Sequence, residues 1–301
     1  MKMNAFVRAK YGSPDVLQVE EVEKPTPKDK EVLVKIYAAS VNVDDLEHLR
    51  GTIAVRLIGP LKPKYKILGS DIAGRIEAVG RNVQQFQPGD AVFGDLTDYG
   101  FGAFAEYVCV PENALVLKSA SMTFEEASTV TSRAAIAVKY LRAERPIQPG
   151  HKILINGAGG GVGTFAVQIA KYYGADVTGV DSAGKLDMLR SIGADHVIDY
   201  TKEDFTESGE TYNVIFDAVG KMKPSGKKAL KKTGIYVNVL KDSGSLGKPA
   251  RARQDLTLLK EICEAGKFKA VIDRRYPLEQ TAEAHRYVEK GHKKGNVVIT
   301  V

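Results

Sequence analysis

Residues 151–171, HKILINGAGGGVGTFAVQIAK, predict an apolar strand, a glycine loop and an amphipathic helix in that order. The loop covers residues 157–163, and the helix covers residues 164–173 before a glycine ends it. Glycines in such a loop let the backbone approach a pyrophosphate, and the N-terminus of the following helix stabilises its negative charge. Ala158 replaces the first glycine of the usual Gly-x-Gly-x-x-Gly pattern, but glycines flank it on both sides. The stretch predicts a dinucleotide-binding turn, with an ordinary tight turn as the alternative.

The alternation of strands and helices extends on both sides of this stretch. It begins at Thr123, which forms a predicted capping box with Glu126 at the start of a helix. Beyond the glycine loop, a helix is expected at residues 182–192, and strands are expected at residues 176–181, 196–200, 212–219 and 234–240. Strands that alternate with helices form βαβ units, and right-handed crossovers then give a doubly wound parallel sheet of the Rossmann type.

The two outer parts of the chain have a different pattern, of short strands separated by glycine and proline turns. In the first part, strands are expected at residues 31–41, 71–79, 90–93 and 105–110, which indicates a partly open barrel or sandwich. In the last part, strands are expected at residues 271–278 and 295–301 around a helix at residues 281–290. The strand at residues 295–301 is expected to rejoin the first domain.

These patterns predict an α/β protein of two domains. Residues 1–122 together with 266–301 are expected to form a β-rich catalytic domain, and residues 123–265 a dinucleotide-binding domain. The length of 301 residues agrees with this division, because it is about twice the ~150 residues typical of one domain.

The composition narrows the class of protein. With 44% hydrophobic and 27% charged residues, the chain is neither disordered nor fibrous, and its net charge of +6 suits an anionic ligand as well as a nucleic acid. Two distant cysteines, Cys109 and Cys263, exclude a disulfide framework and a cysteine-rich zinc site. Arg8 and Lys10 stand where a signal peptide needs its apolar region, and no apolar run is long enough to span a bilayer. A cytoplasmic protein is expected.

The residues after the second Rossmann strand bear on the choice of cofactor. Asp181 follows Gly160 at about the 20-residue spacing of a carboxylate that binds the adenosine ribose, which favours NADH. Ser182, Lys185 and Tyr200 are expected at the same adenosine end, where they could bind a 2′-phosphate. Alternatively, Lys185 is a solvated helix residue and Asp181 caps the helix that follows. Taken together, we expect NADPH, with NADH as the alternative.

A resemblance to a known family rests on segments that together cover almost the whole chain. They are ASVNVDDLEHLRG, ILGSDIAGRIEAVG, FQPGDAVFG, FAEYVCVP, INGAGGGVGTFAVQIAK, SIGADHVIDYTKEDF and KGNVVITV. With these segments in this order, the chain resembles the zinc-independent branch of the medium-chain dehydrogenase/reductase superfamily, the NADPH:quinone oxidoreductase-like proteins. The resemblance implies a GroES-like catalytic domain built from both ends of the chain, a Rossmann domain inserted between them, and a cofactor in the cleft.

The resemblance also implies candidate catalytic residues and argues against zinc. Asn42 and Asp45 match the Asn-x-x-Asp of the quinone reductases, where an amide could orient a carbonyl and a carboxylate could relay a proton. Alternatively, Asn42 makes a turn and Asp45 caps a helix over residues 45–50. The zinc-dependent branch has Gly-His-Glu where this chain has Gly69-Ser70-Asp71, and a ligand cysteine near the position of Asn42. No metal site is expected.

The expected cofactor contacts combine the glycine loop with residues implied by the resemblance. Relatives have Pro and Thr at the positions of Thr131 and Ile136, so Thr131 could supply the hydroxyl that the nicotinamide pocket loses. Residues 238–256 look abbreviated in a region that gives relatives a nicotinamide loop and often a dimer interface. The residues expected to bind the cofactor are Thr131, Gly157, Gly159, Gly160, Gly161, Val162, Gly163, Asp181, Ser182, Lys185, Tyr200, Val219 and Val239.

Two remaining patterns are expected to be structural. Residues 221–232, KMKPSGKKALKK, contain six lysines, but no aromatic residues interleave to stack on bases, so a solvated face is expected rather than a nucleic-acid site. The histidines show neither metal spacing nor a Ser-His-Asp pattern, and most are expected at the surface. They are His48, His151, His196, His285 and His292.

The leading functional hypothesis is a zinc-free, NADPH-dependent reductase of a quinone or another conjugated carbonyl, such as an enone or alkenal. The alternative is a cofactor-binding redox sensor or RNA-binding protein with little turnover. A small-molecule substrate is expected, no membrane partner is expected, and a homodimer is compatible with the resemblance.

Overall fold

A computed structural model describes residues 1–143, 147–220, 222, 224–239 and 249–301. The chain divides into two compact units. Unit 1 comprises Met1–Ser132, Pro249–Lys260 and Ile272–Val301, and unit 2 comprises Arg133–Lys248 and Glu261–Val271. Helix α8 (Pro249–Glu264) contributes to both. None of the helices in the described ranges is long and apolar enough to cross a membrane.

Unit 1 is built on a mixed seven-stranded sheet in the order β13-β14-β3-β4-β5-β7, with β6 also paired to β3. These strands are β3 (Glu31–Val41), β4 (Asp71–Val79), β5 (Ala91–Asp95), β6 (Tyr107–Pro111), β7 (Leu115–Leu117), β13 (Ile272–Pro277) and β14 (Asn296–Thr300). A separate antiparallel pair consists of β1 (Lys2–Arg8) and β2 (Leu17–Glu23), which the sequence analysis missed. Valine and isoleucine side chains of β3 and β14 are fully buried in the core of this unit.

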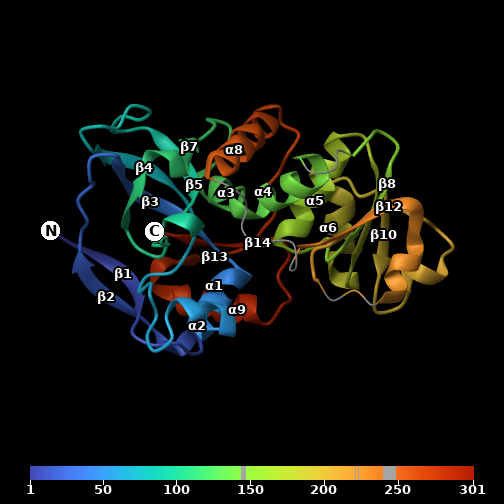
Figure 1. Ribbon diagram of the computed structural model, residues 1–301, viewed down its shortest axis with the longest axis horizontal. Coiled ribbons are helices and arrows are strands. Elements are labelled where there is room, and N and C mark those ends of the chain that lie inside the picture. Colours follow the sequence, from blue (N-terminus) through green and yellow to red (C-terminus); the bar gives the residue numbers. More distant parts are fainter. Residues whose placement is uncertain (144–146, 221, 223, 240–248) are drawn as a thin grey trace. The chain divides into compact units, whose positions relative to one another are not determined.

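Strand β14 brings the C-terminal part of the chain into the sheet, where it lies between the edge strand β13 and β3. It pairs antiparallel with β3, placing Val297 opposite Val41 and Ile299 opposite Ala39. The prediction that this strand rejoins the first part of the chain is therefore confirmed. Besides part of α8, the described residues of unit 1 include four helices, of which α1 contacts α9 (Figure 1). They are α1 (Val43–Arg50), α2 (Ile53–Ile58), α3 (Phe124–Thr129) and α9 (Thr281–Glu289).

Unit 2 contains a five-stranded parallel sheet in the order β10-β9-β8-β11-β12, the arrangement of a Rossmann fold (Figure 1). The strands are β8 (Lys152–Asn156), β9 (Asp176–Asp181), β10 (His196–Asp199), β11 (Tyr212–Asp217) and β12 (Leu230–Asn238). The helices are α4 (Ser132–Val138), α5 (Gly161–Tyr172) and α6 (Leu186–Ser191). Helix α5 packs on β8 and β9. The predicted α/β fold with a doubly wound parallel sheet is confirmed.

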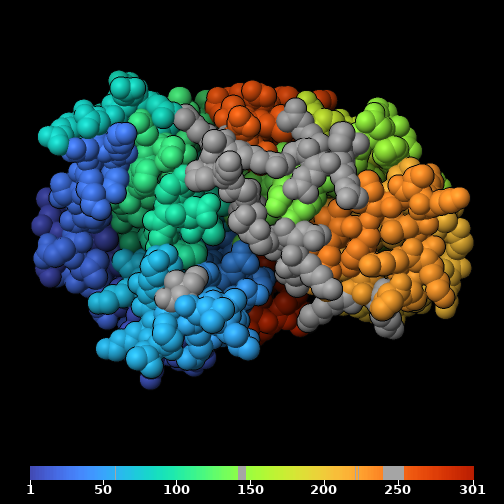
Figure 2. Space-filling model, in the orientation of Figure 1, coloured from blue at the N-terminus to red at the C-terminus, as the bar shows by residue number. Residues whose placement is uncertain are grey.

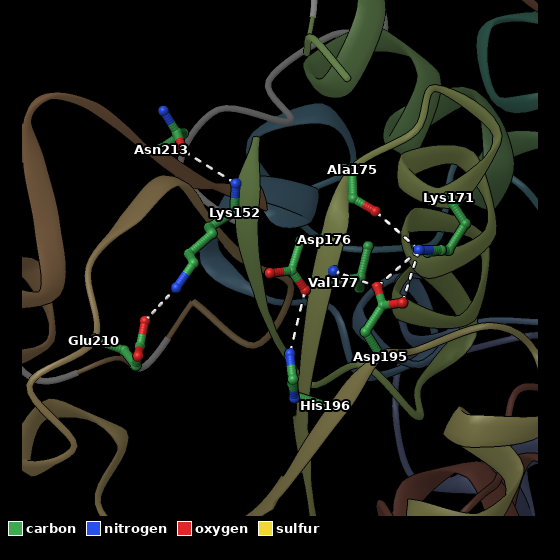
Figure 3. A network of polar contacts seen from close by, with 9 residues as sticks. All are labelled: Lys152, Lys171, Ala175, Asp176, Val177, Asp195, His196, Glu210 and Asn213. Atoms are coloured by element: carbon green, nitrogen blue, oxygen red, sulfur yellow. Dashed lines mark hydrogen bonds and ion pairs between the residues drawn. The ribbon is translucent and has the colours of Figure 1, made fainter. Parts of the chain in front are cut away.

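Polar contacts hold the strands of this sheet where they begin (Figure 3). Lys171, near the end of α5, donates to the carbonyl of Ala175 at 3.0 Å and to both oxygens of Asp195 at 2.9 and 2.7 Å. Asp195 also accepts from the backbone N–H of Val177 at 2.8 Å. Burial raises the pKa of Asp195, but these donors outweigh burial and lower the pKa below its usual value. Because the network lies at the amino ends of the strands, the carboxyl ends stay available for a ligand.

The structure corrects three details of the sequence analysis. Helix α5 begins at Gly161 rather than residue 164, because the glycines of the loop join its first turn. Strand β12 begins at Leu230 rather than residue 234. Most of the five histidines were expected at the surface, but His285 is fully buried in α9 with its ring edge-on to Phe104.

Candidate functional site: a dinucleotide-binding loop and a buried carboxylate cluster

The glycine loop between β8 and α5 has the close approaches that require glycine. Gly157 has a φ of +77°, and a Cβ there would lie 2.5 Å from Cγ2 of Val219. Gly160 is the N-cap of α5. A Cβ on Gly163 would lie 2.2 Å from the carbonyl oxygen of Gly157, so only glycine lets the helix pack this close to the loop. The first N–H groups of α5 have no carbonyl within the helix to bond to, which makes this N-terminus suitable for a phosphate.

The adenosine-end residues predicted from sequence come together around Asp181. Its Oδ2 accepts the backbone N–H of Gly159 at 2.8 Å, and its Oδ1 accepts the backbone N–H of Ser182 at 2.8 Å. The Nζ of Lys185 lies 3.1 Å from the same Oδ1, and both side chains are largely buried. The backbone N–H of Tyr200 donates to the carbonyl of Asp181 at 3.2 Å, while the Tyr200 side chain is 61% exposed.

In this geometry the negative charge of Asp181 is paired rather than free to repel a ligand phosphate. The carboxylate is directed toward the backbone of the glycine loop, and Lys185 compensates its charge. A free carboxylate here would repel a 2′-phosphate, but one paired with a cation repels it much less. The arrangement therefore fits a dinucleotide and removes the main electrostatic objection to NADPH.

Asp217, at the carboxyl end of β11, orders residues beside the glycine loop, and the sequence analysis did not single it out. Its Oδ1 accepts from Nδ2 of Asn156 at 2.9 Å and from the backbone N–H groups of Val219 and Gly220 at 3.1 and 2.9 Å. Its Oδ2 accepts from the hydroxyl of Tyr236 at 2.8 Å. Asp217 thus orders the turn that places Val219 against Gly157. The sequence does contain a signal for this residue, because the apolar strand β11 ends in an acidic residue.

The Asn-x-x-Asp motif of unit 1 forms a capping box at the start of α1. Asn42 is the N-cap, and its backbone N–H donates to Oδ2 of Asp45 at 2.8 Å. Both side chains are buried. The alternative in which Asp45 caps a helix over residues 45–50 is wrong, because the helix begins at Val43 and its N-cap is Asn42. The arrangement gives both residues a structural role, and it does not test a catalytic one.

A second carboxylate, Asp71 at the start of β4, gathers polar side chains from three segments of unit 1. It is fully buried. Its Oδ2 accepts from Oγ of Ser40 at 3.1 Å, from Nδ2 of Asn42 at 2.5 Å and from Oγ of Ser132 at 2.8 Å. Its Oδ1 accepts from the backbone N–H of Ser132 at 3.2 Å. Asp71 therefore fixes the orientation of the Asn42 amide, a role that sequence alone did not show.

For the remaining residues predicted to bind the cofactor, the described part of the structure gives burial and local contacts but no link to the glycine loop. Thr131, in unit 1, is buried, and its hydroxyl donates to the carbonyl of Ser128 at 3.1 Å. Val239 is buried after β12 in unit 2. Of the segment 238–256 that looked abbreviated, residues 240–248 lie outside the described residues. In the basic cluster 221–232, residues 221 and 223 also lie outside them.

Comparisons with known proteins agree with both units. Two family models match: an alcohol dehydrogenase GroES-like domain over residues 28–120 and a zinc-binding dehydrogenase over residues 192–299. A 2-methylene-furan-3-one reductase of Solanum lycopersicum is 36% identical, over 99% of this chain and 79% of its own. An NADPH-dependent alkenal/one oxidoreductase, chloroplastic, of Arabidopsis thaliana is 33% identical over the same shares, 99% and 79%.

A solved structure agrees as well. A quinone oxidoreductase of Pseudomonas syringae pv. Tomato DC3000 has a TM-score of 0.86 at 27% identity, and the match covers 99% of this chain and 100% of the other. The chain belongs to the medium-chain dehydrogenase/reductase superfamily, among its NADPH:quinone oxidoreductase-like proteins. The resemblance inferred from the sequence, including its GroES-like domain, is confirmed.

The description of one matching family names zinc, but the residues of this chain do not suit that metal. Ser70 and Asn42 stand where the zinc-dependent branch has a histidine and a cysteine, and an amide whose Nδ2 is held by Asp71 is a poor zinc ligand. Within the described ranges, no three His, Cys, Asp or Glu side chains gather closely enough to hold a metal ion. The absence of zinc stays a prediction.

Proposed function

We propose that this protein is a reductase that uses NADPH to reduce a quinone or another conjugated carbonyl compound. The observation that carries the proposal is the loop in unit 2, where five glycines within residues 157–163 lead into the N-terminus of α5 and the Asp181–Lys185 pair lies beside Gly159, an arrangement suited to a dinucleotide phosphate. The relatives named as alkenal/one, furanone and quinone oxidoreductases support the substrate class. The bound cofactor would supply a hydride.

The residues of the chain would then bind and orient the reactants. The N–H groups of Gly161, Val162 and Gly163 would hold the pyrophosphate, and Ser182, Lys185 and Tyr200 would hold the adenosine end. Val219, Val239 and Thr131 are proposed to lie beside the nicotinamide. A conjugated carbonyl can take its proton from solvent, so a strong catalytic base is not required. Asn42 and Asp45 remain candidates for orienting the carbonyl.

The choice of NADPH makes a prediction for Lys185. In Lys185→Ala, NADPH binding should weaken by about 1–3 kcal/mol, since the 2′-phosphate loses a charged donor and Asp181 loses its compensating cation. NADH has no 2′-phosphate, so its binding should barely change. Isothermal titration of both cofactors into the parent and the variant measures the two effects. Lys232→Ala, at an exposed lysine of β12, is the control. An equal loss for both cofactors, or tighter NADH binding by the parent, would contradict NADPH as the cofactor.

The activity itself is tested by following NADPH oxidation with quinones, enones, alkenals and simple aldehydes. We expect turnover with the conjugated compounds and little with the simple aldehydes, because conjugation spreads the negative charge left by hydride addition, whereas a simple aldehyde needs a metal ion or a placed proton donor to activate its carbonyl. Tight NADPH binding with no turnover on any of them would instead favour the redox sensor or RNA-binding alternative. The cytoplasmic location and the homodimer stay predictions, and the Arabidopsis relative is named as chloroplastic.

A further inference from the structure

Residues 52–66 of unit 1, TIAVRLIGPLKPKYK, expose aliphatic side chains to solvent. Ile53, Leu57 and Leu61 are 85%, 82% and 92% exposed. Ile53 and Leu57 lie four positions apart in α2 and therefore share one face of that helix. Figure 2 shows the part of the chain that contains this segment, in light blue, at the surface. We call residues 52–66 the basic aliphatic segment.

The charges of this segment all have one sign. Arg56, Lys62, Lys64 and Lys66 are exposed, and the segment contains no Asp or Glu. Where the structure describes the chain, none of these four side chains takes part in an ion pair. The nearest acidic residues before the segment, Asp44 and Glu47, belong to α1 and have interactions of their own. The segment therefore presents uncompensated positive charge beside exposed aliphatic carbon.

Hydrogen bonds attach the segment to the rest of unit 1, so its exposure belongs to an anchored structure. Nε of Arg56 donates to the carbonyl of Gly51 at 2.8 Å, and the hydroxyl of Tyr11 donates to the carbonyl of Gly59 at 2.7 Å. The guanidinium of Arg56 also lies 4.8 Å from the centre of the Tyr11 ring. At the far end, the backbone N–H of Arg8 donates to the carbonyl of Lys66 at 3.0 Å.

From this combination we infer that the basic aliphatic segment docks on the surface of an anionic lipid bilayer. The three aliphatic side chains would enter the boundary between headgroups and acyl chains, and the lysines would meet the lipid phosphates. Docking of this kind needs no membrane-spanning helix, so it departs from the expectation of no membrane partner, which considered only apolar runs. The inference does not depend on the substrate of the enzyme.

Two other binding partners suit the basic aliphatic segment less well than a lipid surface. A second copy of the chain would bring the same positive charges face to face in a two-fold contact, and like charges oppose such a contact. Single-stranded RNA would meet the lysines, but its bases stack on aromatic rings, and the most exposed large side chains here are aliphatic.

Co-sedimentation with vesicles tests the inference. The parent protein should bind vesicles of phosphatidylcholine and phosphatidylglycerol in equal amounts, bind pure phosphatidylcholine far less, and lose binding as salt is raised. Lys62→Gln/Lys64→Gln should weaken binding about 25-fold, at about fivefold per lysine. Leu57→Ser/Leu61→Ser should weaken it at least about tenfold, because less apolar surface enters the interface. All four side chains are exposed, so thermal unfolding should match the parent.

A matched control is Val19→Ser in β2. Val19 is 47% exposed but stands beside Glu20 and Glu21, and this variant should bind vesicles like the parent. Three results would overturn the inference: a parent that does not sediment with the anionic vesicles, a lysine variant that binds them like the parent, or a leucine variant that binds them like the parent. A dimer in sedimentation velocity that only the leucine variant loses would instead assign the segment to a second copy. If the parent and the leucine variant bound polyuridylate equally well, the basic aliphatic segment would be assigned to RNA binding.

Discussion

Asp71→Ala is expected to lower the free energy of unfolding by about 3 kcal/mol, because three buried side chains and one backbone N–H lose their shared acceptor. The donors come from Ser40, Asn42 and Ser132, and water has little access to replace the carboxylate. Asp71→Asn should cost less, since the amide oxygen still accepts one of these bonds. Urea denaturation of the three proteins at neutral pH measures the differences.

The control for this prediction is Asp98→Ala in the same unit. Asp98 is exposed, so its removal should change stability by no more than about 0.5 kcal/mol. If Asp71→Ala were as stable as the Asp98 variant, the carboxylate would not hold Asn42 and Ser132 in the way the distances imply.

His285 is expected to make the protein lose about 3 kcal/mol of stability between about pH 6.5 and pH 4. Burial lowers the pKa of His285 to about 4, although its hydrogen bond to the carbonyl of Thr281 at 2.7 Å acts in the opposite direction. Among the described residues, none bonds to its Nε2. The unfolded chain takes up a proton near pH 6.5, whereas the folded protein resists it until about pH 4. The contribution is therefore complete above pH 6.5 and is lost as pH falls.

The variant His285→Gln separates this effect from the titration of carboxylates. Glutamine can still donate to the Thr281 carbonyl but takes up no proton, so the variant should have a flatter stability curve over the same pH range. Urea midpoints at several pH values give the slopes. The exposed His292→Gln serves as the control and should keep the slope of the parent. Parallel curves for the parent and His285→Gln would show that the buried ring does not resist protonation.

The parts of the fold that could be predicted from sequence are those with local signals. The glycine loop, the strand before it, the helix after it and the Thr123–Glu126 capping box depend on residues within a few positions of one another, and the structure confirms them. Strand β2 was missed because acidic residues interrupt its apolar pattern on an exposed face, and β1, which pairs only with β2 in its sheet, has a short apolar run between basic residues.

The parts of the site that could not be predicted depend on long-range contacts. Asp71 and Ser132 are 61 residues apart in the chain, as are Asn156 and Asp217, and no local pattern connects either pair. The pairing of Lys185 with Asp181 is local, yet sequence could not show whether the lysine faces solvent, a phosphate or the carboxylate. Likewise, the spacing of Ile53 and Leu57 is typical of a buried helix face, and only the structure shows that the face is exposed.

The place of β14 between β13 and β3 has a consequence for the order in which the protein folds during synthesis. Val41 leaves the ribosome long before Val297, so β3 lacks its neighbour β14 while the whole of unit 2 is made. Unit 2 is almost continuous in sequence and can fold in the meantime. Until β14 arrives, one edge of β3 has unpaired backbone groups, and exposed strand edges favour aggregation. We therefore expect unit 1 to be the part of the nascent chain that aggregates more readily during synthesis.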